Sequence, residues 1–482
     1  MKPDNRCTLA IDQGTQSSRA LLFDDAGRQI AGTSQKIGLN RIDRHHVEQD
    51  GNEILASLHK VITEILGSSD TVQATAAGLA TQRSSVIAWN RQTGETLSPV
   101  LSWQDRRAHA WLETLAGRSA DIHRITGLPL TPHYGASKLR WLLHHNSKVQ
   151  DAARNGTLAM GPLAAFIVAN LTFDYPGLVD HANASRTQLW NLERTEWDSD
   201  LLEVFGIEKQ WLPMTCPIRS AYGMLHPEKI PLKAVNGDQT AALHADGGIA
   251  RDTVVVNLGS GGFVLKPTGS ALMLHDALLS GLSDSVDGEQ SYLLEGTVNG
   301  AGAALRWAEK QHGLDTSPAA ISDALQRCPA PQLLFVNSVG GYGSPWWMEG
   351  PSPCWRDAVG KVVSRPEKTA AIASLVESIL FLVMHNLLLL QDISPGIRQI
   401  HISGGLSGQD LLCQKLANLA GLPVMRSNQP EATARGIAWL AAGKPASWIR
   451  SSAVWFHPGD DGQLSQRYDD ATDLLKEMRC NS

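Results

Sequence analysis

Cysteine is scarce in this chain, and no two cysteines stand in a spacing that binds metal or builds a disulfide framework. Six of the 482 residues are cysteine, scattered from Cys7 to Cys480, and no Cys-x-x-Cys pair occurs. Closely spaced pairs mark zinc sites and small disulfide-stapled domains. The sequence therefore predicts neither kind of site.

Long apolar runs and runs of basic residues are also missing. The most apolar stretch, residues 379–390, contains His385 and Asn386 and is too short to cross a bilayer, so we expect a buried helix there. No apolar segment typical of a signal peptide precedes the first expected strand. A net charge of −6 without a basic cluster argues against a nucleic-acid-binding surface. We expect a cytoplasmic protein whose partners include neither nucleic acid nor a membrane.

The stretch from Asp12 to Arg19 is rich in small polar side chains and lies between two short apolar runs, residues 8–11 and 20–23. Such runs predict two antiparallel strands joined by a turn. Gly14 lets the backbone turn tightly, and the hydroxyl and amide groups of residues 15–18 could surround a phosphate. Asp12, at the end of its strand, could hold a hydrated Mg²⁺. An ordinary polar hairpin is the alternative that these residues leave open.

A second hairpin of the same kind begins the other half of the chain. Residues 253–257 form an apolar run, followed by a Gly/Ser turn at residues 258–262 and a further apolar run. This repetition predicts an internally duplicated fold with a phosphate between the halves. The turn is not a Walker A loop, because no Gly-Lys-Ser/Thr follows it. The chain is too long for one core, and a break at Gly247-Gly248 predicts domains at residues 1–246 and 247–482.

Arg83, Trp103 and Asp238 each follow an expected strand. Ligand-binding groups of α/β proteins are often placed at strand ends, so these three predict a pocket for a polar small molecule with one apolar wall. The alternatives are a surface arginine, a core tryptophan and a simple helix cap. A metal at His45 and His46 is a minor alternative, because adjacent residues of an extended chain point to opposite sides.

Apolar periodicity predicts the main helices. One is expected to start at residues 47–50, with Asp50 and Glu53 forming a capping box. Others are expected at residues 138–145, 159–170, 368–392 and 410–420. Pro430 is expected in the first turn of the last large helix, and the polar tail after Trp455 carries little signal.

In this order the motifs resemble the FGGY family of carbohydrate kinases, and within it the glycerol kinases most. The resemblance runs nearly from end to end and is weakest at residues 145–225 and after residue 450. No single segment is specific alone. The segments are Asp12 through Arg19, Val47 through Asp50, Gln82-Arg83, Trp103 through Arg107, Gly237 through Gln239, Gly259 through Gly261, Glu295 through Trp307, Gly341 through Trp347, Ser403 through Gly405 and Glu431 through Ala434.

The resemblance implies an α/β fold of two actin-like (ribonuclease H-like) domains with ATP and Mg²⁺ in the central cleft. The N-terminal domain would bind the substrate, and the C-terminal domain most of the nucleotide. Asp238 resembles the catalytic base, and Asp12 and Asp238 resemble the metal-associated residues. Positions similar to nucleotide or phosphate contacts are Gly14, Thr15, Gln16, Ser17, Arg19, Gly259, Ser260, Gly302, Arg306, Gly405 and Gln409. Positions similar to substrate contacts are Arg83, Ser84, Trp103, His133, Tyr134, Asp238 and Gln239.

Two positions depart from the glycerol kinase pattern, and both bear on the substrate. Ser84 stands where those enzymes have a hydroxyl-binding glutamate, and His133 stands where they have a tyrosine, with Tyr134 displaced by one position. The loss of two polar partners is expected to weaken glycerol binding and to leave room for a longer polyol or a ketose. The alternative is that a water or Tyr134 fills the gap and glycerol remains the substrate.

The sequence therefore predicts an ATP-dependent kinase that phosphorylates a terminal hydroxyl of a small polyol or ketose, with glycerol, xylulose and ribulose among the candidates. One rival is a non-catalytic actin-like nucleotide switch. Another is a ligand-binding regulator that has lost activity. The oligomeric state stays open, with a homodimer as one option.

Overall fold

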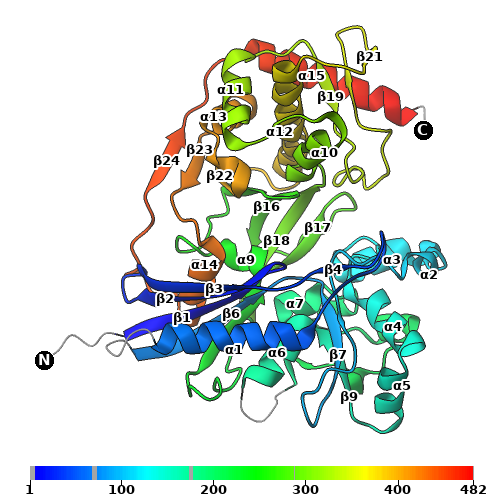
Figure 1. The fold of residues 1–482 in the computed structure, drawn as a ribbon, viewed down its shortest axis with the longest axis vertical. Coiled ribbons are helices and arrows are strands. Elements are labelled where there is room, and N and C mark those ends of the chain that lie inside the picture. Colours follow the sequence, from blue (N-terminus) through cyan, green and yellow to red (C-terminus); the bar gives the residue numbers. More distant parts are fainter. Residues whose placement is uncertain (1–5, 68–72, 173–176, 287, 481–482) are drawn as a thin grey trace, which may run out of the picture.

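The structure is a computed structural model that describes residues 6–67, 73–172, 177–286 and 288–480 of the chain. Figure 1 shows two lobes, one built mainly from the N-terminal half (blue to green) and one from the C-terminal half (green to red). Each lobe contains a sheet whose first two strands in chain order are one of the two predicted hairpins.

The N-terminal lobe is built on a five-stranded sheet in the order β14-β6-β1-β2-β3. Its strands are β1 (Arg6–Gln13), β2 (Ser17–Asp24), β3 (Gln29–Lys36), β6 (Gln73–Thr81) and β14 (Leu232–Gly237). β1, β2 and β3 are antiparallel neighbours, whereas β6 runs parallel to both β1 and β14. The first hairpin is confirmed, and the parallel pairing brings the ends of β1, β6 and β14 to one edge of the sheet.

Helices cover both faces of this sheet. α1 (Gly51–Gly67) packs on β2 and β3, in a core that also holds Leu9 and Ile11 of β1. α14 (Ala432–Ala441) packs on β1, β6 and β14, in a core that holds Ala10 between them. Figure 1 shows this orange helix beside the blue strands, so a late segment of the chain completes the core of the N-terminal lobe.

A second, smaller sheet extends the N-terminal lobe in the order β4-β5-β8-β7-β9. Its strands are β4 (Asn40–Arg41), β5 (Val47–Gln49), β8 (Val100–Leu101), β7 (Val86–Asn90) and β9 (Leu158–Pro162). The remaining elements of this lobe are α2 (His109–Glu113), α3 (Ser119–Thr126), α4 (Gly135–His145), α5 (Ser147–Arg154), α6 (Leu163–Leu171), β10 (Leu178–Asp180), α7 (His181–Ser185), β11 (Trp190–Asn191), β12 (Glu196–Trp197), α8 (Ser199–Phe205), β13 (Met214–Cys216) and α9 (Asp238–Ala242).

Two predictions in this lobe were wrong. Residues 47–49 do not start a helix, because β5 pairs with β4 and β8; α1 begins at Gly51, and Glu53 accepts a hydrogen bond from the Gly38 N–H instead of completing a capping box. The apolar run at 159–170 is not one helix. Its first part is β9, paired with β7, and the helix begins after Pro162. An apolar run that is buried on all sides has no period to separate strand from helix.

The C-terminal lobe repeats the arrangement of the first sheet. Its seven strands lie in the order β17-β18-β16-β15-β22-β23-β24. β15 pairs antiparallel with β16 and parallel with β22, as β1 pairs with β2 and β6, so the predicted duplication is confirmed. The strands are β15 (Thr253–Leu258), β16 (Gly262–Gly269), β17 (Leu279–Val286), β18 (Glu289–Val298), β22 (Gln399–Ser403), β23 (Val424–Ser427) and β24 (Ala453–Phe456), beside a small sheet of β19 (Leu334–Val336), β20 (Cys354–Arg356) and β21 (Val362–Val363).

The helices of this lobe are α10 (Gly302–His312), α11 (Pro318–Arg327), α12 (Lys368–Ile393), α13 (Asp410–Ala420) and α15 (Gly462–Cys480). α12 is long and apolar enough to cross a membrane, but 78% of its most apolar window is buried inside the protein. It is therefore a core helix, and its bounds agree with the predicted helix at residues 368–392.

One expectation near the C-terminus was wrong, and a segment that the sequence left unassigned contains a helix. α14 begins at Ala432 with Glu431 as its N-cap, so Pro430 lies just outside the first turn. The tail after Trp455 contains α15, which packs on α12 and α13. Most of α15 is polar and solvent-facing, and such a helix gives a weak apolar pattern.

Candidate active site

The turn of the first hairpin is held by contacts with the second sheet of the same lobe. The Gly14 N–H donates to the Ser17 carbonyl at 2.9 Å. The Thr15 hydroxyl accepts from Trp103 Nε1 at 3.0 Å, and the Thr15 carbonyl accepts from Gln49 Nε2 at 2.9 Å. The predicted phosphate-binding turn therefore lies against Trp103, one of the predicted substrate contacts.

Asp12 and Arg19 face each other across the hairpin at paired positions of β1 and β2. Arg19 forms an ion pair with Asp12 and a second one, at 2.6 Å, with Glu431 at the start of α14. Burial raises the pKa of Asp12 to about 6, although the Arg19 charge works in the opposite direction. Asp238 also raises the Asp12 pKa, so the two predicted metal-associated carboxylates lie within electrostatic reach of each other.

The turn of the second hairpin contacts the start of α10. The N–H groups of Gly302 and Ala303 donate to the carbonyls of Gly259 and Ser260 at 3.0 and 2.8 Å. A Cβ on Gly302 would lie 2.7 Å from the Gly259 carbonyl oxygen, so glycine is what allows this close packing. These two N–H groups are thus already bonded within the protein.

The other predicted nucleotide contacts lie around this turn. Gly404 is next to the Leu258 backbone at the end of β15, which puts Gly405 at the same edge. Arg306 is exposed one helical turn after Gly302, and Gln409 precedes α13 and donates to the Pro318 carbonyl at 3.1 Å. The structure therefore gathers Gly259, Ser260, Gly302, Arg306 and Gly405 at one end of the C-terminal sheet.

Arg83 and Asp238 meet at the carboxyl edge of the N-terminal sheet. Parallel pairing places Gly237 of β14 beside Thr81 of β6. Asp238 directly follows Gly237, and Arg83 lies two residues after Thr81. Arg83 Nε lies 4.0 Å from Asp238 Oδ1. A Cβ on Gly237 would lie 2.5 Å from Arg83 Cγ, so the stem of Arg83 runs directly over this glycine.

Burial raises the pKa of the Asp238 carboxyl, and the Arg83 charge partly offsets the rise. Asp238 opens α9 as predicted, and its side chain is 30% exposed, so a ligand can reach it. Gln239 follows in the same helix and is partly exposed beside it.

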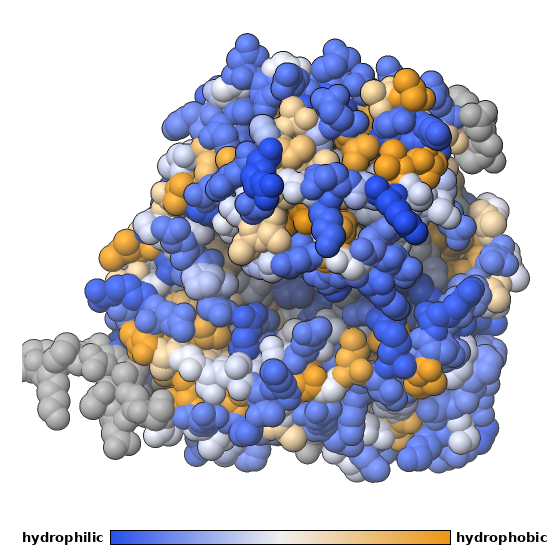
Figure 2. Space-filling view, turned by 45° about the horizontal axis from the view of Figure 1, so that its top comes forward, coloured by the Kyte–Doolittle hydropathy of each residue, from blue (hydrophilic) through white to orange (hydrophobic). Residues whose placement is uncertain are grey.

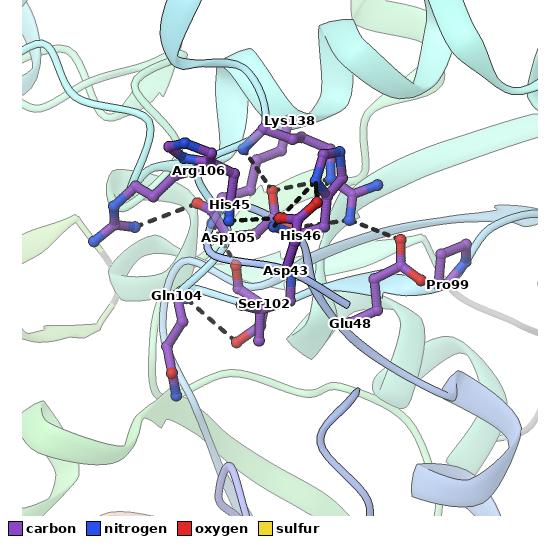
Figure 3. Close-up of polar contacts among 12 residues, drawn as sticks. Asp43, His45, His46, Glu48, Pro99, Ser102, Gln104, Asp105, Arg106 and Lys138 are labelled. Atoms are coloured by element: carbon purple, nitrogen blue, oxygen red, sulfur yellow. Dashed lines mark hydrogen bonds and ion pairs between the residues drawn. The ribbon is translucent and has the colours of Figure 1, made fainter. Parts of the chain in front are cut away.

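Lys138 connects three chain segments that carry predicted substrate contacts. Its ammonium is buried and donates to the carbonyls of Ser84, Ser102 and His133 at 3.0, 2.8 and 2.7 Å. Figure 3 shows Lys138 close to Ser102 and Asp105. Asp105 is fully buried and ties β5 to one of these segments, since it accepts from the Val47 N–H at 2.7 Å.

His45 and His46 lie beside this network and make protein contacts. His46 Nδ1 is 2.9 Å from Asp43, and the His45 ring stacks on His109 with 4.4 Å between ring centroids. Within the described ranges, no group of three or more His, Cys, Asp or Glu side chains could hold a metal ion.

The aromatic residues of the predicted pocket form a continuous surface. The ring centroids of Trp103 and His133 are 5.8 Å apart, and those of His133 and Tyr134 are 4.9 Å apart. Burial and the neighbouring Arg106 hold the His133 pKa well below its ordinary value, so the ring is neutral. The Ser84 hydroxyl is buried and has no hydrogen-bond partner among the described residues, on a backbone with φ of 63°.

Sequence reasoning missed the charges that the other lobe supplies. Glu295 of β18 is 1% exposed and pairs with Arg83 at 3.1 Å and with Arg186 at 2.6 Å. Glu431, the N-cap of α14 in the N-terminal lobe, is a further distant partner and pairs with Arg19 at 2.6 Å. These partners lie more than a hundred residues apart in the chain. Glu295 and Glu431 each begin a motif of the family resemblance, but the sequence does not indicate which arginine either one pairs with.

The two groups of predicted site residues face each other across the junction of the lobes. Figure 2 shows this face hollowed between the lobes, with mostly hydrophilic side chains around the hollow. The N-terminal side supplies two carboxylates and a pocket of polar and aromatic groups. The C-terminal side supplies a Gly/Ser turn and a helix start.

Comparison with known proteins identifies the family. The model for the N-terminal domain of the FGGY family of carbohydrate kinases matches residues 7–243, and that for its C-terminal domain matches residues 254–443. Glycerol kinase of Geobacter sp. is 32% identical over 457 residues, which cover 92% of this chain and 91% of that protein.

Solved structures agree on the fold. Plasmodium falciparum glycerol kinase with ADP gives a TM-score of 0.88 at 23% identity and covers 98% of both chains. Xylulose kinase of Lactobacillus acidophilus gives 0.85 at 20% identity over 99% of this chain and 98% of that one. The predicted pair of actin-like domains is confirmed, and the protein is a phosphotransferase that acts on alcohol groups of sugars or polyols. The chain belongs to the FGGY family of carbohydrate kinases.

Proposed function

We propose that this protein transfers the terminal phosphoryl group of ATP to a terminal hydroxyl of a small polyol or ketose, with Asp238 as the general base. The observation that carries the proposal is the meeting of Asp238 with Arg83 at the edge of the N-terminal sheet, 4.0 Å apart. Asp12 and Arg19 lie within electrostatic reach of the same carboxylate. The Asp238 carboxylate can therefore lie close to both the acceptor hydroxyl and the phosphoryl group that is transferred.

The base has an environment suited to its role. Burial raises the pKa of Asp238, which strengthens it as a proton acceptor. The Arg83 charge opposes this rise in the Asp238 pKa, and the Arg83 guanidinium can donate to an acceptor oxygen. Because phosphoryl transfer has a loose transition state, alignment of the hydroxyl by Asp238 and Arg83 is their main contribution, and the proton moves late.

The residues present fit Mg²⁺ with ATP. Mg²⁺ is usually held by one or two carboxylates together with substrate phosphates, and Asp12 and Asp238 are two such carboxylates. When bound, the ion would neutralise negative charge on the phosphate groups. The hydroxyl and amide groups of Thr15, Gln16 and Ser17, with the Arg19 guanidinium, would contact the transferred group.

The acceptor is proposed to be larger than glycerol. The buried Ser84 hydroxyl has no hydrogen-bond partner within the described ranges, and His133, whose pKa is held well below its ordinary value by burial, presents its ring beside Trp103. Both groups can bond to hydroxyls of a longer polyol or a ketose. Glycerol is the second candidate, because Tyr134 lies next to His133 and the relatives at about 30% identity are named glycerol kinases.

The Asp238→Asn variant tests the assignment. General base catalysis contributes about 10²- to 10⁴-fold, so ATP-dependent phosphorylation across a panel of glycerol, erythritol, ribitol, xylulose and ribulose should fall by that factor. Asp198→Asn is the control, since Asp198 is also a buried carboxylate at a helix start, in α8. It should keep near-normal turnover, and an unchanged rate in Asp238→Asn would reject Asp238 as the base.

A further inference from the structure

Glu295 is a carboxylate of one lobe buried among cations of the other. It lies in the middle of β18 in the C-terminal sheet and is 1% exposed. Oε2 accepts from Arg83 at 3.1 Å and from Arg186 at 2.6 Å, and Oε1 accepts from Arg83 at 3.4 Å. Both arginines belong to the N-terminal lobe, so this ion cluster exists only while the lobes touch.

Arg83 is fixed at both ends by this arrangement. Its two terminal nitrogens point to Glu295, its Nε faces Asp238, and its stem lies over Gly237. Planar, two-pronged pairing with a carboxylate orients a guanidinium more strongly than a single contact does. Without the Glu295 charge, Arg186 would lose this ion pair and Arg83 would keep only the more distant Asp238, at 4.0 Å, while the two guanidiniums still face each other, which disfavours their present positions.

The same lobe also covers the aromatic side of the pocket. Tyr134 packs with Leu128 of its own lobe and with Leu279 and Trp347 of the other. The Ser280 N–H donates to the Gly127 carbonyl at 2.9 Å nearby. Strands β17 and β18 therefore contact the acceptor pocket at its aromatic and at its charged side.

We propose that Glu295 is a positioning residue that couples closure of the lobes to assembly of the acceptor pocket. Glu295 turns Arg83 toward Asp238 when the lobes meet and releases it when they part. An acceptor bound between Arg83 and Asp238 in turn favours the closed form, because it binds tightly only there. The inference rests on the proposed function, since it assigns the acceptor to this pocket.

The Glu295→Gln variant keeps the size of the side chain and removes its charge. Its matched control is Glu377→Gln, because Glu377 is equally buried and also pairs with two cations, Lys415 at 2.9 Å and Arg467 at 2.5 Å, all within the C-terminal lobe. Both variants should lower Tm. Only Glu295→Gln should raise KM for the acceptor, by about tenfold to a hundredfold.

A double-mutant cycle with Arg83→Gln separates positioning from general stability. If Glu295 acts through Arg83, the double variant should bind acceptor no worse than Arg83→Gln alone. The proposal is overturned if the two effects multiply. It is also overturned if Glu295→Gln changes Tm as Glu377→Gln does and leaves KM for the acceptor unchanged.

Small-angle X-ray scattering measures how closely the two lobes approach each other, and it requires no enzymatic turnover. Glu295→Gln should have a larger radius of gyration than Glu377→Gln, and equal radii would overturn the coupling. If the wild-type enzyme phosphorylates no acceptor, the proposed function fails, while the scattering comparison still decides whether Glu295 holds the lobes together.

Discussion

Ser84, one of the proposed acceptor contacts, carries a buried hydroxyl with no hydrogen-bond partner in the part of the chain that the structure describes. A buried, unpaired polar group is costly, and a ligand hydroxyl would satisfy it. Its left-handed backbone, with φ of 63°, is rare for a residue other than glycine and is typical of functional sites.

The Ser84→Glu variant should shift acceptor preference toward glycerol. A glutamate would fill the space that Ser84 leaves and offer a charged acceptor to a hydroxyl of a short polyol. The ratio of kcat/KM for glycerol to that for the best longer acceptor should rise about tenfold or more. Ser84→Ala, which keeps the space open, should not raise the ratio. Equal losses with both acceptors in Ser84→Glu would show that this position does not select the substrate.

The places of individual site residues could be predicted from the sequence where a residue lies directly at the end of a predicted strand. Asp12 and Asp238 stand at strand ends, and the structure places them there because parallel pairing aligns those ends. Lys138, Arg186 and Glu295 could not be given roles. Their partners come from distant segments, and a single sequence carries no signal for which charges meet.

At the level of elements, α14 contacts both carboxylate-bearing segments of the proposed site, through Arg19 on the Asp12 side and through the backbone on the Asp238 side. Glu431 at its N-cap pairs with Arg19, and the Thr433 hydroxyl donates to the Asp238 carbonyl at 3.3 Å. Gly436 sits where α14 crosses α9, and a Cβ there would lie 1.9 Å from the Ala241 carbonyl oxygen. The absence of a side chain at residue 436 therefore sets how closely the helix approaches Asp238.

Replacing Gly436 by alanine should destabilise the protein and weaken the site. Overpacking against backbone costs about 1–3 kcal/mol or more, so Tm in a thermal melt should fall clearly below that of the wild type. Gly117→Ala is the control, because no atom lies within 4 Å of a Cβ at that position. Equal Tm values for the two variants would show that α14 adjusts its position freely.

Helices and strands whose apolar residues recur with a clear period were predicted well. Those without such a period were not. The two hairpins, α12 and α13 lie where the apolar pattern places them. The apolar run of β9 is buried throughout, so it shows no period that separates strand from helix, and α15 is mostly polar, so it gives only a weak apolar pattern. In both segments the tertiary contacts decide the secondary structure, and a single sequence does not show those contacts.

At the level of the whole molecule, the lobes are joined by ion pairs across their junction. Arg83–Glu295, Arg186–Glu295 and Arg219–Asp284 connect the N-terminal lobe to strands of the C-terminal sheet. The duplication could be predicted from the repeated hairpin. The return of α14 into the first lobe could not, because nothing local in residues 432–441 says which sheet they cover.

The central claim is that the site between the lobes phosphorylates a polyol or ketose and does not merely bind or hydrolyse nucleotide. ADP formation from Mg-ATP, measured with and without each acceptor of the panel, tests it most directly. Closure of the lobes excludes water, so ADP should form quickly only with an acceptor present, in a one-to-one ratio with phosphorylated product. Equal ADP formation without any acceptor would indicate a nucleotide switch, and no ADP formation with any acceptor would indicate an inactive regulator; either result would contradict the account.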